Sequence, residues 1–489
     1  MRGNYTNNCR SKITFLKRCI SDWTDIATKN FPIDRRAIYN MLRLKFLIIY
    51  TFFVLTIDTS SSSTTDRPAT WSFSFGDLSL FNIPKLGRSI LENVRVVTEN
   101  PINIVDILPR VRDVDPGVLV DSHLKTPALI KKYGYPVEVH HTITDDGYIL
   151  ELHRIVRDGA TPVLLMHGLL DSSATWVMMG PNKGLAYLLY DEGYDVWMPN
   201  VRGNTYSRNH TKYTTKDGRF WDFTFHEMGK YDLPASIDYI LVHTGCEKLH
   251  YIGHSQGSMT FWIMCSEHPE YSEKIILMQA LAPVAYVKHS KSPVVQFLAF
   301  FQDPIGMLLK LIGAHEFLPN NEFMTMFSQL ICDEDTFTLD ICSDVIFLIS
   351  GFDRAQANET MLPVVLGHSP AGASTKQMQH FGQLKRSGHF RQYDYGWLRN
   401  YWTYNSVSPP EYHLENTRNK VALHYSQNDW LATPVDVEQL HLKLPNVVGK
   451  FLVGYPHFNH LDFVWGVDAH DLLYIRVLRL MRLVERGEL

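Results

Sequence analysis

The fold can be worked out from Lys248-Leu249-His250-Tyr251-Ile252-Gly253-His254-Ser255-Gln256-Gly257. A short apolar run enters a Gly-x-Ser-x-Gly turn, and a segment rich in Met and aromatic residues follows, as in a buried helix. A turn of this kind between a strand and a helix raises the serine hydroxyl above the end of a sheet. Any side chain at Gly253 or Gly257 would clash in so tight a turn. The motif therefore predicts Ser255 as an accessible nucleophile; the alternative is an ordinary serine in a glycine-rich turn.

The composition limits the classes of protein to which the chain can belong. Its 489 residues, 45% of them hydrophobic, suit a single enzyme core with an insertion. From residue 58 onward there are 37 basic and 48 acidic residues, and no basic patch is evident, so we expect no nucleic-acid partner. The 22 histidines include no His-Glu-x-x-His motif and no clustered Cys/His pairs, so we expect neither a metal nor a cofactor.

An apolar run at residues 46–57 indicates targeting to the secretory pathway. Arg43 and Lys45 precede this run and a Ser/Thr-rich stretch follows it. Twelve residues are too few to span a bilayer comfortably as a helix, but they fit the apolar region of a signal peptide that starts at Met41. We therefore expect a secreted or lysosomal protein. The alternative is a signal anchor that tethers the protein to a membrane through residues 44–57.

Two pairs of residues bear on processing in that pathway. Cys332 and Cys342 are close enough in sequence to form a disulfide across a short loop. Asn209 and Asn358 lie in Asn-x-Thr sequons and are candidate glycosylation sites.

Strand-like and helix-like segments alternate along most of the chain. A hairpin is expected over residues 137–154 with its turn at Asp146-Gly147, and further strands over 162–166, 194–199, 275–281, 421–426 and 450–454. Helices are expected between them, over 184–192 and 231–244. Such alternation predicts an α/β fold, the α/β-hydrolase fold, with a mostly parallel central sheet and helices on both faces.

The pattern divides the chain into five parts. We interpret residues 1–57 as an extension plus the signal peptide or anchor, and 58–109 as a linker or propeptide. Residues 110–281 and 419–489 are the two parts of the hydrolase core. Residues 282–418 interrupt the core with aromatic and amphipathic segments, which predict a mainly helical cap or lid over the serine. A plain helical subdomain packed on the core is the alternative.

A serine nucleophile needs a base within hydrogen-bond reach and a carboxylate to orient that base. In this fold they follow in the order Ser, Asp or Glu, His, after later strands. Asp429 comes just after the strand at 421–426 and is the candidate carboxylate, with Asp436 as its nearest rival. Asp436 falls inside a helix-like segment.

The loop after the strand at 450–454 offers two candidates for the base. The position of His460 favours it over His457, but the residues alone do not exclude His457. Asp462 could orient the base, but a carboxylate at the start of a helix is the preferred interpretation. His254, beside the nucleophile, is expected to point away from it and pack locally.

The negatively charged oxygen of a tetrahedral intermediate needs backbone N–H donors. The residue after the nucleophile, Gln256, supplies one of them in this fold. The other comes from the loop after an early strand, in His167-Gly168-Leu169-Leu170, most plausibly from Leu169.

The chain resembles the acid lipases, which include gastric, lysosomal and insect gut lipases. The resemblance rests on several motifs: Gly253-His254-Ser255-Gln256-Gly257, His167-Gly168-Leu169-Leu170 with Trp176, Pro199-Asn200-Val201-Arg202-Gly203-Asn204, Lys230-Tyr231-Asp232-Leu233-Pro234-Ala235, Asn428-Asp429-Trp430-Leu431-Ala432 and Asn459-His460-Leu461-Asp462-Phe463. It covers about residues 106 to 485.

The resemblance implies hydrolysis of neutral lipid esters, triacylglycerols and in some members cholesteryl esters, at a lipid–water interface. It assigns the catalytic triad to Ser255, Asp429 and His460, which settles the choice of histidine, and the oxyanion donors to Leu169 and Gln256. It places a cap disulfide on Cys332 and Cys342. Ser350 departs from the pattern, since gastric members carry a free cysteine there, and this changes thiol sensitivity rather than catalysis.

Two other functions remain open on the sequence. A catalytically silent lipid carrier would bind lipid without acylation of Ser255. A serine hydrolase of another class, such as a thioesterase or peptidase, would prefer other bonds, although the apolar insertion favours lipid esters.

Overall fold

The computed structural model describes residues 116–292, 295–296, 315–317 and 349–489. The apolar run at 44–57, the linker at 58–109, Cys332 and Cys342 lie outside the described residues. Most of the first half of the expected cap lies outside them too.

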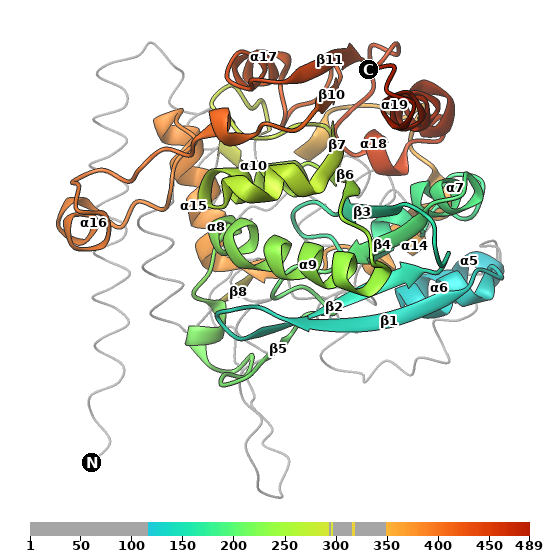
Figure 1. Ribbon diagram of the computed structural model, residues 1–489, viewed down its shortest axis with the longest axis horizontal. Coiled ribbons are helices and arrows are strands. Elements are labelled where there is room, and N and C mark those ends of the chain that lie inside the picture. Colours follow the sequence, from blue (N-terminus) through green and yellow to red (C-terminus); the bar gives the residue numbers. More distant parts are fainter. Residues whose placement is uncertain (1–115, 293–294, 297–314, 318–348) are drawn as a thin grey trace, which may run out of the picture. The chain divides into compact units, whose positions relative to one another are not determined.

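One large sheet organises the described chain (Figure 1). Its strands are β1 (Val137–Ile143), β2 (Tyr148–Ile155), β3 (Pro162–Met166), β4 (Asp195–Pro199), β5 (Asn209–His210), β6 (Leu249–His254), β7 (Ile275–Leu281), β10 (Val421–Tyr425) and β11 (Val447–Leu452). They follow the order β1-β2-β4-β3-β6-β7-β10-β11, and β5 pairs with β2. A separate pair joins β8 (Glu316–Phe317) to β9 (Ala373–Ser374).

Along the order β4-β3-β6-β7-β10-β11 each strand is parallel to the next, whereas β2 is antiparallel to β1, β4 and β5. This is the α/β-hydrolase arrangement, so the predicted fold class is confirmed. Strands β7 and β10 pair with each other, with Val421 beside Met278, although the whole insertion separates them in sequence. The core therefore forms from two distant parts of the chain.

In the described part of the chain, helices lie before, between and after the strands of the large sheet. They are α5 (Pro116–His123), α6 (Thr126–Lys132), α7 (Leu185–Asp191), α8 (Phe225–Glu227), α9 (Leu233–Thr244), α10 (Gln256–Glu267), α14 (Leu362–His368), α15 (Thr375–Ser387), α16 (Trp397–Tyr404), α17 (Pro434–His441), α18 (Asp462–Trp465) and α19 (Ile475–Glu485). In Figure 1, α9 and α10 run side by side over the strands.

Two consecutive residues of β6 show that both faces of the sheet are covered. His250 Nε2 lies 3.0 Å from the Glu485 carboxylate of α19, while the Tyr251 hydroxyl donates a 2.7 Å hydrogen bond to the Gly257 carbonyl of α10. Successive side chains of a strand point to opposite faces, so α19 and α10 lie on opposite sides. Strands β3, β4 and β6 are buried along their whole length, as expected for the centre of a doubly covered parallel sheet.

Helix α5 is the first described element and begins at Pro116, within the predicted first part of the core at 110–281. Helix α5 packs against α14. His368 Nε2 lies 3.1 Å from the Asp121 carbonyl, and a Cβ added at Gly367 would lie 2.2 Å from the Ser122 carbonyl oxygen. Close backbone approach of this kind explains a contact that local periodicity did not reveal. Among the described residues, no helix combines the length and apolar character needed to span a bilayer.

Candidate active site

Ser255 lies at the turn between β6 and α10, with backbone angles φ 52° and ψ −117°. These angles are strained for a residue with a side chain. The turn has room only for glycine at two positions. A Cβ at Gly253 would lie 2.7 Å from the Gly257 carbonyl carbon, and one at Gly257 would lie 2.3 Å from the Met166 carbonyl oxygen. The Ser255 N–H also donates to the Leu281 carbonyl at 3.0 Å. Glycine at both positions therefore lets α10 press onto β3 and fixes the direction of the serine side chain.

Three predicted side chains meet at this turn. His460 Nε2 lies 2.7 Å from Ser255 Oγ, and His460 Nδ1 lies 2.8 Å from Asp429 Oδ2. The three residues lie in the turn or loops that follow β6, β10 and β11. Each is almost completely buried, with Ser255 the most exposed at 9%. This arrangement is that of a nucleophile, a base and an orienting carboxylate.

The second oxygen of Asp429 is held by the backbone. Asp429 Oδ1 accepts hydrogen bonds from the N–H groups of Leu431 at 2.8 Å and Ala432 at 2.7 Å. A carboxylate this deeply buried needs such donors in place of water. They also prevent rotation of the carboxylate, so Oδ2 stays directed at the imidazole.

The rival residues considered in the sequence have other partners. His457 is exposed to solvent. Asp436 accepts hydrogen bonds from the His289 N–H and the Thr433 hydroxyl at 3.0 Å each, inside α17. Asp462 begins α18 and accepts from the Asn459 N–H at 2.6 Å, as expected for a carboxylate at a helix start.

His254 packs against the back of the base. Its Nε2 lies 2.9 Å from the His460 carbonyl oxygen, and the two rings are 5.0 Å apart. Burial lowers the pKa of His254 to about 3, with the neighbouring His460 contributing. A neutral His254 donates to the His460 carbonyl and therefore supports the backbone of the base.

The loop after β3 carries the second candidate oxyanion donor, Leu169. His167 orders this loop: its Nδ1 lies 2.9 Å from the Gly168 carbonyl, and its Nε2 lies 3.3 Å from the Val201 N–H. Burial lowers the pKa of His167 to about 4, which keeps the ring neutral and lets Nε2 accept. Leu170, at φ 60°, directs its carbonyl to the Ala371 N–H at 2.7 Å.

Gln256 faces this loop across a small cavity. The cavity is lined by residues of the β3 loop, the β4 loop and α15, among them Gly168, Leu170 and Gln377. The amide of Gln377 donates a hydrogen bond to the side-chain carbonyl of Gln256. Helix α15 therefore supports the first turn of α10, a contact that sequence reasoning missed.

The segment 350–353 was also missed as a functional element; only its substitution at Ser350 was noted. The Ser350 carbonyl accepts hydrogen bonds from the Trp430 N–H at 3.2 Å and the His460 N–H at 3.3 Å. The Gly351 carbonyl accepts from Asn459 Nδ2 at 3.1 Å. One short segment thus connects the loop of the carboxylate to the loop of the base.

A pair of carboxyl groups, Asp353 and Asp462, lies at the end of this segment. Burial, reinforced by the charges of Asp353 and Asp429, raises the pKa of Asp462 to about 8. Burial also raises the pKa of Asp353, and the two carboxyls are hydrogen-bonded to each other. Such a bond requires one proton between the two groups, since two adjacent carboxylates repel.

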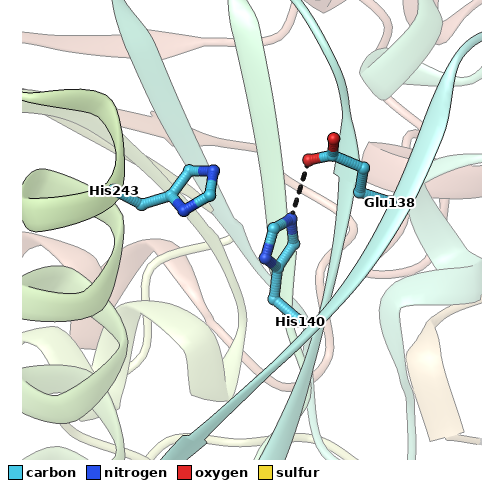
Figure 2. A group of neighbouring side chains, drawn as sticks. All are labelled: Glu138, His140 and His243. Carbon is cyan, nitrogen blue, oxygen red and sulfur yellow. Dashed lines mark hydrogen bonds and ion pairs between the residues drawn. The ribbon is translucent and has the colours of Figure 1, made fainter.

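One group of side chains elsewhere has the composition of a metal site. Glu138, His140 and His243 place three potential ligand atoms within 4.8 Å of one another, and Figure 2 shows His140 between the other two. However, Arg154 Nη1 donates to Glu138 at 2.9 Å and lies 3.4 Å from His243 Nε2. A guanidinium already supplies the positive charge there, and the Tyr239 hydroxyl lies 3.0 Å from His140 Nδ1. The group is therefore satisfied as a hydrogen-bonded ion cluster.

Comparison with known proteins places this geometry in a family. The alpha/beta hydrolase fold family matches residues 161–467, and a partial alpha/beta-hydrolase lipase region matches residues 126–180. Lipase 1 of Drosophila melanogaster is 44% identical over 387 residues, which cover 79% of this chain and 86% of that protein. The chain belongs to the acid lipase family. Human gastric triacylglycerol lipase is 40% identical, over 71% of this chain and 88% of its own length.

Membership of this family makes the chain a lipase, an enzyme that hydrolyses carboxylic esters of lipids. The mouse gastric triacylglycerol lipase is 39% identical over 74% of this chain and 92% of its own length. Among solved structures, the carboxylesterase CesB of Bacillus subtilis aligns with 76% of this chain and 97% of its own, with 12% identity and a TM-score of 0.43. The family models and the lipase relatives confirm the predicted family and enzyme class.

Proposed function

We propose that Ser255, His460 and Asp429 are the catalytic triad of this lipase and that hydrolysis proceeds through an acyl-enzyme. The observation that carries the proposal is the continuous set of contacts from Ser255 Oγ to His460 Nε2 at 2.7 Å and from His460 Nδ1 to Asp429 at 2.8 Å. Because the Nδ1–H of His460 donates a hydrogen bond to Asp429, the lone pair of Nε2 faces the serine hydroxyl.

The reaction follows from these contacts. His460 takes the Ser255 proton as the hydroxyl oxygen attacks the ester carbonyl carbon, and Asp429 stabilises the imidazolium. The backbone N–H groups of Leu169 and Gln256 donate to the oxyanion. The imidazolium then protonates the departing alcohol. Water activated by His460 attacks the acyl-enzyme, releases the fatty acid and restores the serine.

We propose that the substrates are triacylglycerols and cholesteryl esters. The gastric triacylglycerol lipases among the relatives support the first of these. We also propose that the protein is secreted or lysosomal, which the basic and apolar pattern at 43–57 supports. Of the two candidate glycosylation sites, Asn209 is exposed and Asn358 partly buried, so Asn209 is the better acceptor.

Hydrolysis of emulsified triolein and cholesteryl oleate from pH 4 to 8 tests the proposal, with Ser255→Ala, His460→Ala and Asp429→Asn as variants. Loss of the nucleophile or the base should lower kcat by roughly 10⁴- to 10⁶-fold. Asp429→Asn should lower it by about 10⁴-fold, because the wrong tautomer of His460 would face the serine. Full activity in Ser255→Ala or His460→Ala would overturn the assignment.

A phosphonate probe separates the two alternative functions. A silent lipid carrier would bind triolein without capture of the probe at Ser255. A hydrolase of another class would capture the probe, but would prefer a matched thioester or amide over the ester.

A further inference from the structure

The outer surface of α16 is unusual for a surface helix. Of the fourteen large hydrophobic side chains that are exposed in the described chain, five fall within residues 397–407. Their exposed fractions are 70% for Trp397, 55% for Leu398, 52% for Tyr401, 78% for Trp402 and 64% for Val407. We call these five side chains the aromatic patch. Monomeric proteins rarely expose large apolar side chains together unless that surface binds a protein, a membrane or a ligand.

The buried side of the same helix is polar. Asn400, which is 1% exposed, is the buried residue of α16. Its Nδ2 donates to Asp394 Oδ1 at 2.8 Å and to the Val407 carbonyl at 3.0 Å, and its Oδ1 accepts from the Tyr395 N–H at 2.9 Å. A surface helix normally places its apolar stripe inward. Here the amide is inside and the indoles are outside, so the described residues leave the hydrophobic surface of the helix largely uncovered.

Hydrogen bonds to the segment that precedes α16 connect this helix to α15. Gln383 of α15 donates to the Asp394 carbonyl and accepts from the Asp394 N–H, both at 2.8 Å. The Tyr404 hydroxyl donates to the Tyr393 carbonyl at 2.8 Å. Figure 1 shows α16 at the outer left of the described ribbon, joined to it beside α15. The other end of α15 contacts the active-site turn through Gln377.

The charge of this segment identifies its partner. Residues 395–410 contain no carboxylate and a single cation, Arg399, in a body with an excess of acidic residues. Trp and Tyr rings prefer the boundary between water and lipid, where an apolar ring and a polar atom are both satisfied. A second copy pairing through the same patch would bring two Arg399 side chains together, whereas a lipid surface imposes no such cost.

We propose that the aromatic patch anchors the enzyme to the surface of neutral-lipid droplets. The four side chains of α16 and Val407 enter the interface, and Arg399 lies at the level of the lipid phosphates. The patch acts on binding to the surface, not on bond cleavage. The proposal rests on the lipase function but not on the assignment of the triad.

The test compares Trp397→Ser/Trp402→Ser with the matched control Val242→Ser/Leu442→Ser, whose side chains are 84% and 75% exposed on other elements. Binding is measured by flotation with triolein droplets coated with phosphatidylcholine, in a Ser255→Ala background. Hydrolysis of the droplets and of the soluble ester p-nitrophenyl butyrate is measured with Ser255 intact. All substituted residues are exposed, so we expect unchanged melting temperatures.

The Trp double variant should bind droplets at least about tenfold more weakly and hydrolyse them correspondingly slower at low lipid, with unchanged turnover of the soluble ester. The control should match the parent. Droplet binding by the Trp variant equal to that of the parent would overturn the proposal. So would light scattering that shows a parent dimer and a Trp-variant monomer, because a second copy would then cover the patch. Absence of lipid hydrolysis in the parent would instead contradict the proposed function and leave the binding comparison intact.

Discussion

Replacement of Arg202 by Met should destabilise the fold in a way that depends on pH. Arg202 is 1% exposed and lies between two carboxylates. Its Nε donates to Asp232 Oδ1 at 2.8 Å, and its two terminal nitrogens donate to Asp146 at 2.6 and 2.9 Å. It thereby joins the turn of the β1–β2 hairpin to the start of α9, and its guanidinium stacks 4.0 Å from the Tyr148 ring.

The expected cost follows from the charges that remain. Removing one member of a buried ion network leaves an uncompensated charge and typically costs about 3–5 kcal/mol. Unfolding entropy of about 2.1 cal/mol/K per residue over roughly 370 residues gives about 0.8 kcal/mol/K. The melting temperature of Arg202→Met should therefore fall by about 4–6 °C at pH 8, measured by differential scanning calorimetry.

The loss should be smaller at pH 5. Burial already raises the pKa of Asp232 to about 6 with the guanidinium in place, and its removal raises that pKa further. A carboxyl whose folded pKa lies above its unfolded value stabilises the fold at low pH and loses this contribution as pH rises. In the variant, Asp232 is therefore protonated at pH 5 and costs little folding free energy. At pH 8 it must either carry an unpaired buried charge or take up a proton on folding, and both cost stability.

The double variant Arg202→Met/Asp232→Asn is the control for packing. It removes the unpaired charge and keeps an acceptor, so it should recover part of the lost stability at pH 8. Equal losses for Arg202→Met at pH 5 and pH 8, with no recovery in the double variant, would show that the cost is lost packing and would refute the electrostatic reasoning.

Three further outcomes can be checked. Gly257→Ala should lower kcat at least about 100-fold, because the new Cβ would lie 2.3 Å from a carbonyl oxygen of β3. The control Gly454→Ala should leave kcat unchanged, because no atom lies within 4 Å of its Cβ. Equal kcat values in the two variants would refute the steric argument. Gly351→Ala should lower kcat and the melting temperature together, because φ is 116° at this position and the new Cβ would lie 2.2 Å from the Asn428 carbonyl oxygen. A wild-type kcat in this variant would contradict a positioning role for the segment 350–353. The folded pKa of Asp462, about 8, exceeds its ordinary value of 3.8, so its proton stabilises the fold fully below about pH 4 and this stabilisation is lost as the pH rises towards 8. Asp462→Asn should therefore flatten the fall in melting temperature from pH 5 to 8. An unchanged slope would exclude the carboxyl pair as the cause of that fall.

The positions of the candidate catalytic residues could be predicted because they follow from local patterns and from the order of strands. Ser255 is marked by glycines at fixed spacing. Asp429 and His460 each come just after a recognisable strand, and parallel strands bring their carboxyl ends to one edge of the sheet. Positional reasoning alone left His457 open, and the structure separates the two histidines by burial.

The supporting contacts could not be predicted, because they join segments that are far apart in sequence. Ser350 and His460 are about a hundred residues apart, and no periodicity relates them. The insertion was predicted to be apolar and aromatic, but the outward direction of Trp397 and Trp402 depends on the burial of Asn400. That burial is set by Asp394 and a backbone carbonyl, which a helical pattern does not encode.

The separation in sequence of the proposed nucleophile from its proposed base also has a consequence during synthesis. His460 follows Ser255 by 205 residues, and β10 and β11 complete the sheet only after the whole insertion. At translation rates of about 5–20 residues per second, roughly 10–40 s pass between emergence of the serine and emergence of the histidine. Throughout that interval the nascent chain carries the proposed nucleophile without its proposed base. The order of the strands therefore delays the capacity to attack lipid until almost the entire core has been made.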